Sequence, residues 1–343
     1  MVERLGFACK WLDDPSETAN MKINARNREL NTGTTTVAWL NRQTRQVAEQ
    51  RLWDLMVNNI QANHRLVQRV GSLAPQLRML RLGSDMLPVY TEPTWRYFWQ
   101  RPDVLAYCES ALAELGTCAR QLDVRLSMHP GPFVVLASDR PDVVERSIDE
   151  FEYHATMARH MGYGQTWQDF KINVHIAGKA GPAGIRAAYG RLSPEARNTI
   201  TIENDENAWG LDACLELVDT CPIVLDIHHH LIRDHEYIKA SDDRVKQVIE
   251  SWRGVRPTFH YSMSREDYLI NHDTNTLPIM SLLLENGYKK NKLRAHSDYM
   301  WNYAVNTWAY DHFKWGDCMV ESKSKNLATQ KLFKFWKSLE DHM

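Results

Sequence analysis

Six short apolar runs in this chain each end in a residue that can bind a metal ion. The runs begin at Val124, Phe170, Thr199, Pro222, Pro257 and Met319, and they end at His129, His175, Glu203, Asp226, His260 and Glu321. One such ending occurs by chance, whereas six in series indicate parallel strands whose C-terminal ends point imidazoles and carboxylates at one centre. The sequence therefore predicts a metalloenzyme built on a parallel sheet.

Strand-like and helix-like segments alternate along the chain. We expect strands at residues 4–9, 77–82, 124–128, 170–174, 199–202, 222–226, 257–260 and 318–321. Helical periodicity occurs at residues 37–70, 105–122, 142–161, 182–190, 210–219, 243–252, 298–313 and 326–341. Eight strand–helix units favour an α/β TIM (β/α)8 barrel. A Gly-x-Gly-x-x-Gly motif after a strand would favour an open dinucleotide-binding sheet, and the sequence has none. We expect one domain over residues 1–343, with a long insertion after the seventh strand and a C-terminal helix.

Bulk properties narrow the function classes. The formal net charge of −2 gives no global attraction to nucleic acid or to an anionic membrane, so any DNA contact has to rest on a local basic face or on bound cations. The six cysteines form no Cys-x-x-Cys pair, and no apolar run approaches the ~18 residues that span a bilayer. The N-terminus lacks the form of a signal peptide. We expect a cytoplasmic monomer with no membrane partner.

The candidate ligands share one chemistry, imidazole and carboxylate without thiolate, which suits a catalytic site for Zn²⁺ or Mn²⁺. They are His129, His175, Glu203, Asp226, His229, His260, His296 and Glu321. Eight ligands exceed the needs of one ion, so we expect two or three ions, with Glu203 as a bridge between them. Such a cluster lowers the pKa of bound water and clamps an in-line phosphoryl displacement, and phosphodiester hydrolysis follows as the reaction class.

Not every candidate has equal weight. A lone histidine at a strand end is more often a hydrogen-bonded core or rim residue than a ligand. Glu203 and Asp226 are stronger candidates, because an unpaired carboxylate at the end of an apolar run is costly to bury without a cation. The triple His228–His230 contains at least one residue that is not a ligand, and if the strand ends at Asp226 the loop geometry decides which one.

Ordered motifs in the chain resemble those of the UV damage endonucleases, TIM barrels related in plan to the apurinic endonuclease IV enzymes. The motifs are Leu82–Gly83–Ser84–Asp85 with Pro88, Arg125–Leu–Ser–Met–His129–Pro–Gly131, Val174–His175–Ile176, Ile202–Glu203–Asn204–Asp205–Glu206, Leu225–Asp226–Ile–His–His229, His260–Tyr–Ser262, Ala295–His296–Ser297 and Met319–Val–Glu321–Ser–Lys323. The resemblance implies a DNA repair endonuclease that cuts double-stranded DNA immediately 5′ of a UV photolesion (a pyrimidine dimer). It would leave a 3′-hydroxyl and a 5′-phosphate and use divalent ions, commonly Mn²⁺, with Zn²⁺ or Mg²⁺ as alternatives.

The resemblance also distributes the ligands. It implies that His129, His175 and Glu203 hold one ion. It implies that Glu203, Asp226, His260 and Glu321 hold a second. His229, which the family spacing selects from the triple, and His296 would help to hold a third. Glu203, His129 and His229 are the residues that we expect to be catalytic.

The chain departs from the family where the family reads damaged DNA. Family members usually carry Gln–Tyr after His–Pro–Gly, and this chain has Pro132 and Phe133. A tyrosine common in the first strand is Phe7 here, and an asparagine expected a few residues later falls at Trp11. Inserted aromatic side chains commonly offset the stacking lost when bases are pried apart. We expect Phe133 to be such a wedge, with Phe7 and Trp11 on the same rim. The alternative is that Phe133 packs under a loop.

Three further departures lie nearer the metal ligands. Thr258 stands where a lysine is often found two residues before the seventh-strand histidine, and Asp85 stands where some members have a histidine ligand. Residues 264–293 look like an insertion.

We expect phosphate contacts from the basic run before His296, which comprises Lys289, Lys290, Lys292 and Arg294. A second row on the C-terminal helix, Lys331, Lys334 and Lys337, fits a solvated surface equally well.

Other functions stay open at this point. An apurinic/apyrimidinic-site endonuclease would use the same metals and differ only in the lesion. A metal-dependent sugar isomerase-like barrel also gathers Glu, Asp and His around divalent ions, but it would act on a small polyol and have no use for a basic rim. A barrel with purely structural ions would need closed coordination, which eight ligands facing a cleft disfavour.

Overall fold

The computed structural model describes residues 2–14 and 27–340, and its centre is a barrel of parallel strands. The strands are β1 (Leu5–Ala8), β2 (Met79–Leu82), β3 (Arg125–Met128), β4 (Lys171–His175), β5 (Ile200–Glu203), β6 (Ile223–Val224), β7 (Thr258–Tyr261) and β8 (Asp317–Val320). They are hydrogen-bonded in the order β6-β5-β4-β3-β2-β1-β8-β7. An isolated bridge between Asp226 and His260 links the two remaining edges, and the His260 N–H donates to the Leu225 carbonyl at 2.9 Å. The predicted TIM barrel is confirmed.

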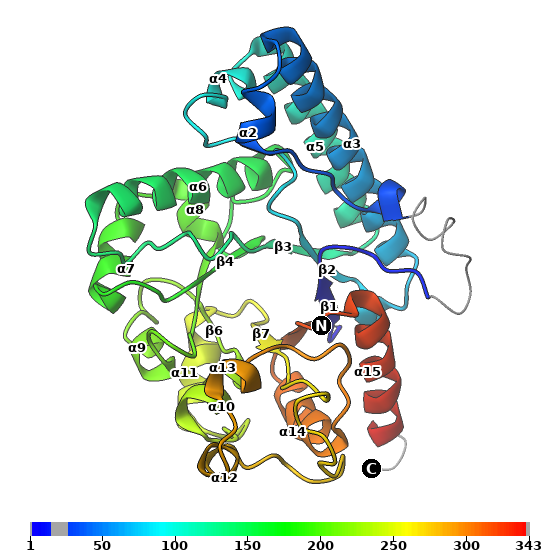
Figure 1. The fold of residues 1–343 in the computed structure, drawn as a ribbon, viewed down its shortest axis with the longest axis vertical. Helices are drawn as coiled ribbons and strands as arrows, with labels where there is room; N and C mark the ends of the chain where they lie inside the picture. Colours follow the sequence, from blue (N-terminus) through cyan, green and yellow to red (C-terminus); the bar gives the residue numbers. More distant parts are fainter. Residues whose placement is uncertain (1, 15–26, 341–343) are drawn as a thin grey trace.

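Helices surround the strands (Figure 1). They are α2 (Val37–Leu40), α3 (Arg45–Gly71), α4 (Arg96–Trp99), α5 (Pro102–Gln121), α6 (Pro141–His160), α7 (Gly181–Tyr189), α8 (Pro194–Thr199), α9 (Leu211–Leu215), α10 (Ile227–Asp234), α11 (Asp243–Ser251), α12 (Met280–Glu285), α13 (Lys290–Leu293), α14 (Tyr303–Phe313) and α15 (Lys325–Glu340), with a 3-10 turn at η1 (Pro75–Leu77). The single helix predicted for residues 37–70 is two helices, because the Thr44 hydroxyl caps a new one by accepting from the Val47 N–H. In the described part of the chain, no helix has both the length and the apolar character to cross a membrane.

Polar side chains fill much of the barrel interior. Side chains alternate between the two faces of a strand, so every second residue points inward. At the end of the barrel opposite the predicted ligands, Arg125 of β3 donates to Asp317 of β8 at 2.6 Å, and Arg256 reaches the same carboxylate at 2.8 Å. This buried ion network ties β3 to β8 beneath the predicted site.

The histidine triple lies on a helix that the sequence did not reveal. Strand β6 ends at Val224, and α10 begins at Ile227. Asp226 is its N-cap, and its Oδ1 accepts hydrogen bonds from the N–H groups of His228 at 2.8 Å and His229 at 2.7 Å. The cap fixes one oxygen of Asp226 and directs the first turn of α10 towards the barrel mouth.

The segment that we expect to be an insertion, residues 264–293, is partly helical and has a small apolar cluster. The cluster comprises Leu231, Ile232, Leu269, Met280 and Leu293. Because Leu231 and Ile232 belong to α10, this segment packs against the helix that carries the histidine triple. It also brings α13, with its basic residues, close to the strand ends (Figure 1).

Candidate metal centre

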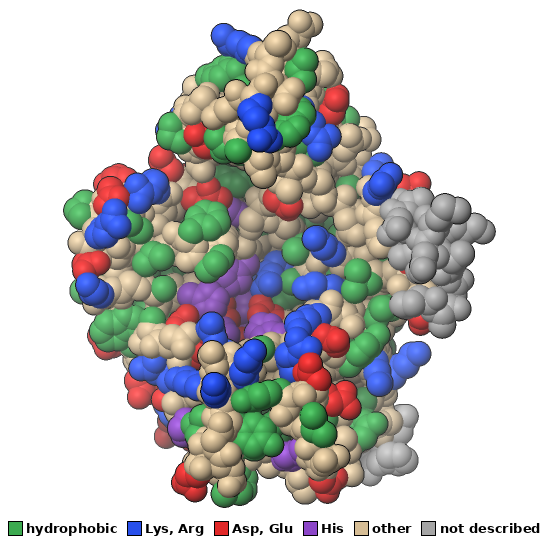
Figure 2. Space-filling view, in the orientation of Figure 1, with side chains coloured by type: hydrophobic (Ala, Val, Ile, Leu, Met, Phe, Trp, Pro, Cys, Tyr) green, Lys and Arg blue, Asp and Glu red, His purple; other side chains and the backbone are tan. Residues whose placement is uncertain are grey.

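A pocket of about 310 Å³ opens at the C-terminal ends of the strands. Five of the predicted ligands line it, namely His129, His175, His229, His296 and Glu321. Figure 2 shows histidine and acidic side chains together on the floor of a hollow in this face of the molecule. Active sites of TIM barrels lie at this end of the strands, so the pocket is the candidate site.

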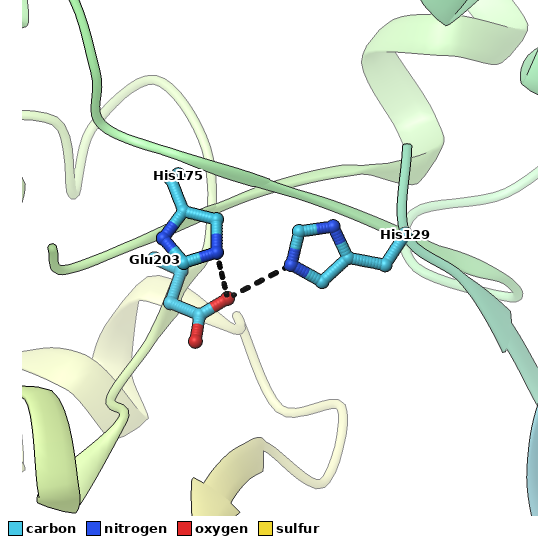
Figure 3. A group of neighbouring side chains, drawn as sticks. All are labelled: His129, His175 and Glu203. Atoms are coloured by element: carbon cyan, nitrogen blue, oxygen red, sulfur yellow. Dashed lines mark ion pairs between the residues drawn. The ribbon is translucent and has the colours of Figure 1, made fainter. Parts of the chain in front are cut away.

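The first group of ligands joins the ends of β3, β4 and β5 (Figure 3). His129 Nε2 lies 3.3 Å and His175 Nε2 lies 3.8 Å from the same oxygen, Oε2 of Glu203. His129 Nδ1–H donates to the Pro130 carbonyl at 2.9 Å, which leaves Nε2 free to accept a cation. These three side chains have the spacing of a metal site.

A second group comprises Glu203, Asp226 and His260, all fully buried. His260 Nδ1 lies 2.9 Å from Glu203 Oε1 and 3.4 Å from Glu321 Oε1, so Glu321 adjoins the group. Oδ2 of Asp226 has no hydrogen-bond partner among the described residues. Glu203 therefore turns one oxygen to each group, which is the arrangement that a bridging carboxylate requires.

His229 and His296 lie at the edge of these groups. His229 Nδ1–H donates to the Asn204 carbonyl at 3.0 Å, and its Nε2 faces Glu206 Oε2 at 3.6 Å. His296 Nδ1 is 3.8 Å from Glu321 Oε2. Within residues 2–14 and 27–340, neither histidine belongs to a close set of three ligand atoms. The third ion stays a prediction.

The charges at the centre favour bound cations. Burial acts to raise the pKa of Glu203, but the imidazoles of His260 and His175 outweigh it and hold that pKa well below its ordinary value. Burial, reinforced by the charges of Glu203 and Glu321, raises the pKa of Asp226 to about 8. Several carboxylates buried this close together are stable only with positive charge among them. The donor set and Oδ2 of Asp226, which accepts no hydrogen bond from the described residues, therefore fit divalent ions.

Two basic side chains at the centre, those of Lys171 and Arg81, were not predicted. Lys171 Nζ lies 2.9 Å from His260 Nε2, and the Arg81 guanidinium contacts Glu321 Oε1. Burial lowers the pKa of Lys171 to about 7, so a neutral amine that accepts from His260 Nε2–H is accessible. That tautomer leaves His260 Nδ1 free for a cation. The available signal was the strand period of two, which puts Lys171 and His175 on one inward face.

The sequence indicated no separate role for Asp205, which lies two residues after Glu203. Asp205 Oδ2 lies 3.4 Å from His175 Nδ1, and its Oδ1 accepts from the N–H groups of Asn207 and Ala208. Burial opposes ionisation, but the neighbouring His175 imidazole and the backbone N–H groups lower the pKa of Asp205 to about 2. A carboxylate behind a ligating histidine fixes the orientation of its ring. Asp205 therefore orients His175.

The loop after His129 carries an exposed aromatic side chain beside the pocket. Phe133 is 66% exposed, and the neighbouring Pro132 is exposed as well. The Phe133 ring lies against Gly131, where a Cβ atom would be 2.4 Å from the ring. Glycine thus lets the ring fold back over the loop at the pocket mouth. The alternative that Phe133 packs under a loop is wrong.

Two residues expected on the same rim lie in the core. Phe7 is 2% exposed and Trp11 is 5% exposed, and their rings meet edge to face with centroids 6.0 Å apart. The predicted rim position of both is wrong, because Phe7 sits in β1 between β2 and β8 and is covered by the core. Asp85 accepts from the Thr32 hydroxyl at 2.9 Å and belongs to neither ligand group.

The basic run lies beside the pocket, and part of it is engaged. Lys289, Lys292 and Arg294 are exposed. Lys290 Nζ donates to the Glu206 carbonyl at 2.9 Å, and Arg294 Nη1 lies 2.5 Å from Glu206 Oε1. Figure 2 shows Lys and Arg side chains flanking the hollow on the side where Figure 1 has α13. The run therefore forms a positive edge next to the candidate centre.

The chain is similar in sequence to known proteins. A sequence model described as UV-endonuclease UvdE matches residues 3–342. The UV-damage endonuclease of Neurospora crassa is 32% identical over 205 residues, which are 54% of this chain and 30% of that protein. The UV-damage endonuclease of Schizosaccharomyces pombe is 28% identical over 269 residues, 75% of this chain and 40% of that protein. The chain thus spans less than half the length of these two relatives.

Solved structures share the fold. The crystal structure of SacUVDE superposes with a TM-score of 0.72 at 21% identity, and the match covers 98% of this chain and 99% of that one. Endonuclease IV from Thermus thermophilus gives a TM-score of 0.52 at 12% identity, over 82% and 95% of the two chains. The family match extends over nearly the whole sequence, and the chain belongs to the UV-endonuclease UvdE family.

Proposed function

We propose that this protein is a metal-dependent DNA repair endonuclease that cuts the phosphodiester immediately 5′ of a UV photolesion and leaves a 3′-hydroxyl and a 5′-phosphate. The observation that carries the proposal is the division of Glu203, with Oε2 facing His129 and His175 and Oε1 facing His260. Membership in the UV-endonuclease family supplies the substrate class.

The proposed ion holders follow from the two groups. His129, His175 and Glu203 would hold one divalent ion, and Glu203, Asp226, His260 and Glu321 would hold another, with Mn²⁺ as the expected metal. Bound there, divalent ions would activate water and neutralise the charge of a phosphodiester. His229 and His296 would contribute at the edge nearest the pocket mouth.

The chain's other residues would bind and orient the DNA. Lys289 and Lys292 are exposed and available to phosphates beside the pocket, and Arg294 would contact a phosphate while paired with Glu206 or in its place. Phe133 stands on the loop that leaves His129, so an inserted ring would lie within a few residues of a proposed ligand. Stacking on that ring would offset the unstacking of a damaged step.

One observation favours a second substrate. The residue before Phe133 is Pro132, which has neither a side-chain amide nor a backbone N–H to hydrogen-bond a damaged base. A site that reads a lesion mainly through an aromatic ring also suits a gap in the base stack. Duplex DNA with an apurinic/apyrimidinic site is therefore the alternative substrate.

The test uses an end-labelled duplex with one thymine dimer, the purified protein and Mn²⁺. We expect a nick immediately 5′ of the dimer, a product that a polymerase extends without end treatment, and no nick after chelation of the metal. The matched controls are the undamaged duplex and the same duplex with one abasic site. Cutting of the abasic duplex alone selects the alternative, and no cutting of either refutes endonuclease action.

A further inference from the structure

Lys171 and Arg81 lie inside the barrel against proposed metal ligands and have no part in the proposed function. Lys171 is the first residue of β4 and is 3% exposed, and its Nζ lies 2.9 Å from His260 Nε2. Arg81 of β2 has 17% side-chain exposure, and its guanidinium contacts Glu321 Oε1. We call this pair the inner cations.

Lys171 contacts the side of His260 that faces away from the carboxylates. The other ring nitrogen, Nδ1, lies 2.9 Å from Glu203 Oε1 and 3.4 Å from Glu321 Oε1. A partner at one nitrogen of an imidazole determines where the other nitrogen points. The lysine contact therefore sets the rotation of His260 that turns Nδ1 towards Glu203.

Arg81 does the same for Glu321. The oxygen that it contacts, Oε1, is the one that faces His260, while Oε2 lies 3.8 Å from His296 Nδ1. A guanidinium is a planar fork of donors, and here one of them, Nη1, contacts Oε1 and holds that oxygen on the side of His260. The two inner cations thus act on adjacent ligands of one group.

Stability alone does not explain a lysine at this place. A buried charge is costly, and an apolar side chain of similar size is often neutral or stabilising in its stead. The hydrogen-bond partner of Lys171 is an imidazole nitrogen rather than a carboxylate. By contrast, Arg125 is another cation inside the barrel, and it pairs directly with Asp317 at the opposite end.

We propose that Lys171 and Arg81 are positioning residues for one cation of the cluster, the one shared by Glu203, Asp226, His260 and Glu321. The inference rests on the proposed metal cluster. Among the described residues, no hydrogen bond or ion pair joins either inner cation to His129 or His175, the partners of Glu203 in the first group. The inner cations therefore act on the second ion and leave the first in place.

The experiment measures metal binding rather than cutting. We titrate three chelator-treated proteins, namely wild type, Lys171→Met and Arg81→Met. Mn²⁺ binding is measured by calorimetry. Co²⁺ binding is measured by visible absorption, which reports the ligand geometry of each ion. Arg81→Lys keeps the charge without the fork. Arg125→Met is the matched control, because it removes a barrel-interior cation that contacts no proposed ligand. Circular dichroism checks that each variant is folded.

We expect wild type to bind at least two ions. Both Met variants should weaken one ion at least tenfold, change its Co²⁺ spectrum, and leave the affinity for another ion within about threefold, while Arg81→Lys restores part of the loss. Arg125→Met should leave both affinities unchanged. Equal affinities in all variants, or equal weakening of every ion, would overturn the positioning role. A wild type that binds fewer than two ions would refute the cluster, and with it the proposed function.

Discussion

Asp226→Asn is expected to change the stability of the metal-depleted protein and of the Mn²⁺-bound protein in opposite directions. Asp226 is fully buried, and burial together with Glu203 and Glu321 raises its pKa from 3.8 to about 8. The substitution removes the charge. It keeps a side-chain oxygen that can accept the N–H groups at the start of α10, because asparagine caps helices about as well as aspartate.

In the metal-depleted protein, the sign of the stability change caused by Asp226→Asn follows from proton binding to Asp226. The folded pKa lies above the unfolded value, so the stability that protonated Asp226 contributes is fully present below pH 3.8 and is lost as the pH rises towards 8. At about 1.36 kcal/mol per pKa unit, the loss at pH 7 is about 4 kcal/mol, and asparagine does not incur it. With an unfolding entropy of about 2.1 cal/mol/K per residue, this corresponds to a rise in Tm of about 6 °C.

The assay is thermal unfolding of both proteins at pH 5 and pH 8, with chelator or with Mn²⁺. In chelator, Asp226→Asn should be the more stable protein, and its advantage should grow from pH 5 to pH 8. In Mn²⁺ the wild type should gain more, since a ligand that binds only the folded state stabilises it by an amount that grows with the logarithm of its affinity. If Asp226→Asn is less stable than wild type in chelator at pH 8, the buried charge of Asp226 does not destabilise the metal-depleted protein. If Mn²⁺ raises both Tm values equally, Asp226 is not a metal ligand.

Three other substitutions test separate parts of the structure. Glu203→Gln should abolish incision while leaving DNA binding in a gel-shift assay largely intact, and unchanged turnover would remove Glu203 from the centre. Phe133→Ala should leave Tm unchanged, because the ring is 66% exposed, but weaken binding to a thymine-dimer duplex about tenfold; equal affinity would exclude the wedge. Burial lowers the pKa of His312 to about 4, so its contribution to stability is present above pH 6.5 and lost, by up to about 3 kcal/mol, as the pH falls towards 4. His312→Gln should flatten the urea-unfolding profile in that window, and a profile as steep as that of wild type would contradict this.

The barrel was predictable because each apolar run marks a buried strand. The end of the barrel with the proposed ligands was predictable because the residue that ends each run lies at the barrel mouth. The rule is exact for Glu203, the last residue of β5, and for His175, the last residue of β4. It is close for His129 and Glu321, each one residue beyond its strand. No knowledge of side-chain contacts was needed for these positions.

The inner cations escaped prediction for a physical reason. A charged residue near the start of a strand usually lies in solvent at the rim, and the period of two, which puts Lys171 on the inward face with His175, does not by itself show that its side chain is buried. Its burial depends on the closure of the barrel, which brings β4 and β7 close enough for Lys171 to reach His260. The prediction for Phe7 and Trp11 was wrong in the opposite direction. The family pattern suggested that both rings lie on an exposed rim, whereas the core covers them.

The exposed ring of Phe133 and the cations of the basic run bear together on the choice between DNA and a small polyol as the substrate. A phenyl side chain left 66% exposed gains nothing from folding, and it stands on the loop that leaves a proposed metal ligand. A free sugar can also stack the C–H face of its ring on a phenyl side chain, but it carries no phosphate for a row of cations. A base pair or an unstacked base offers a flat face to the ring, and the phosphates beside it would meet Lys289, Lys292 and Arg294 along the same pocket edge. The phenyl ring and the cations together therefore support the proposed DNA substrate over a sugar.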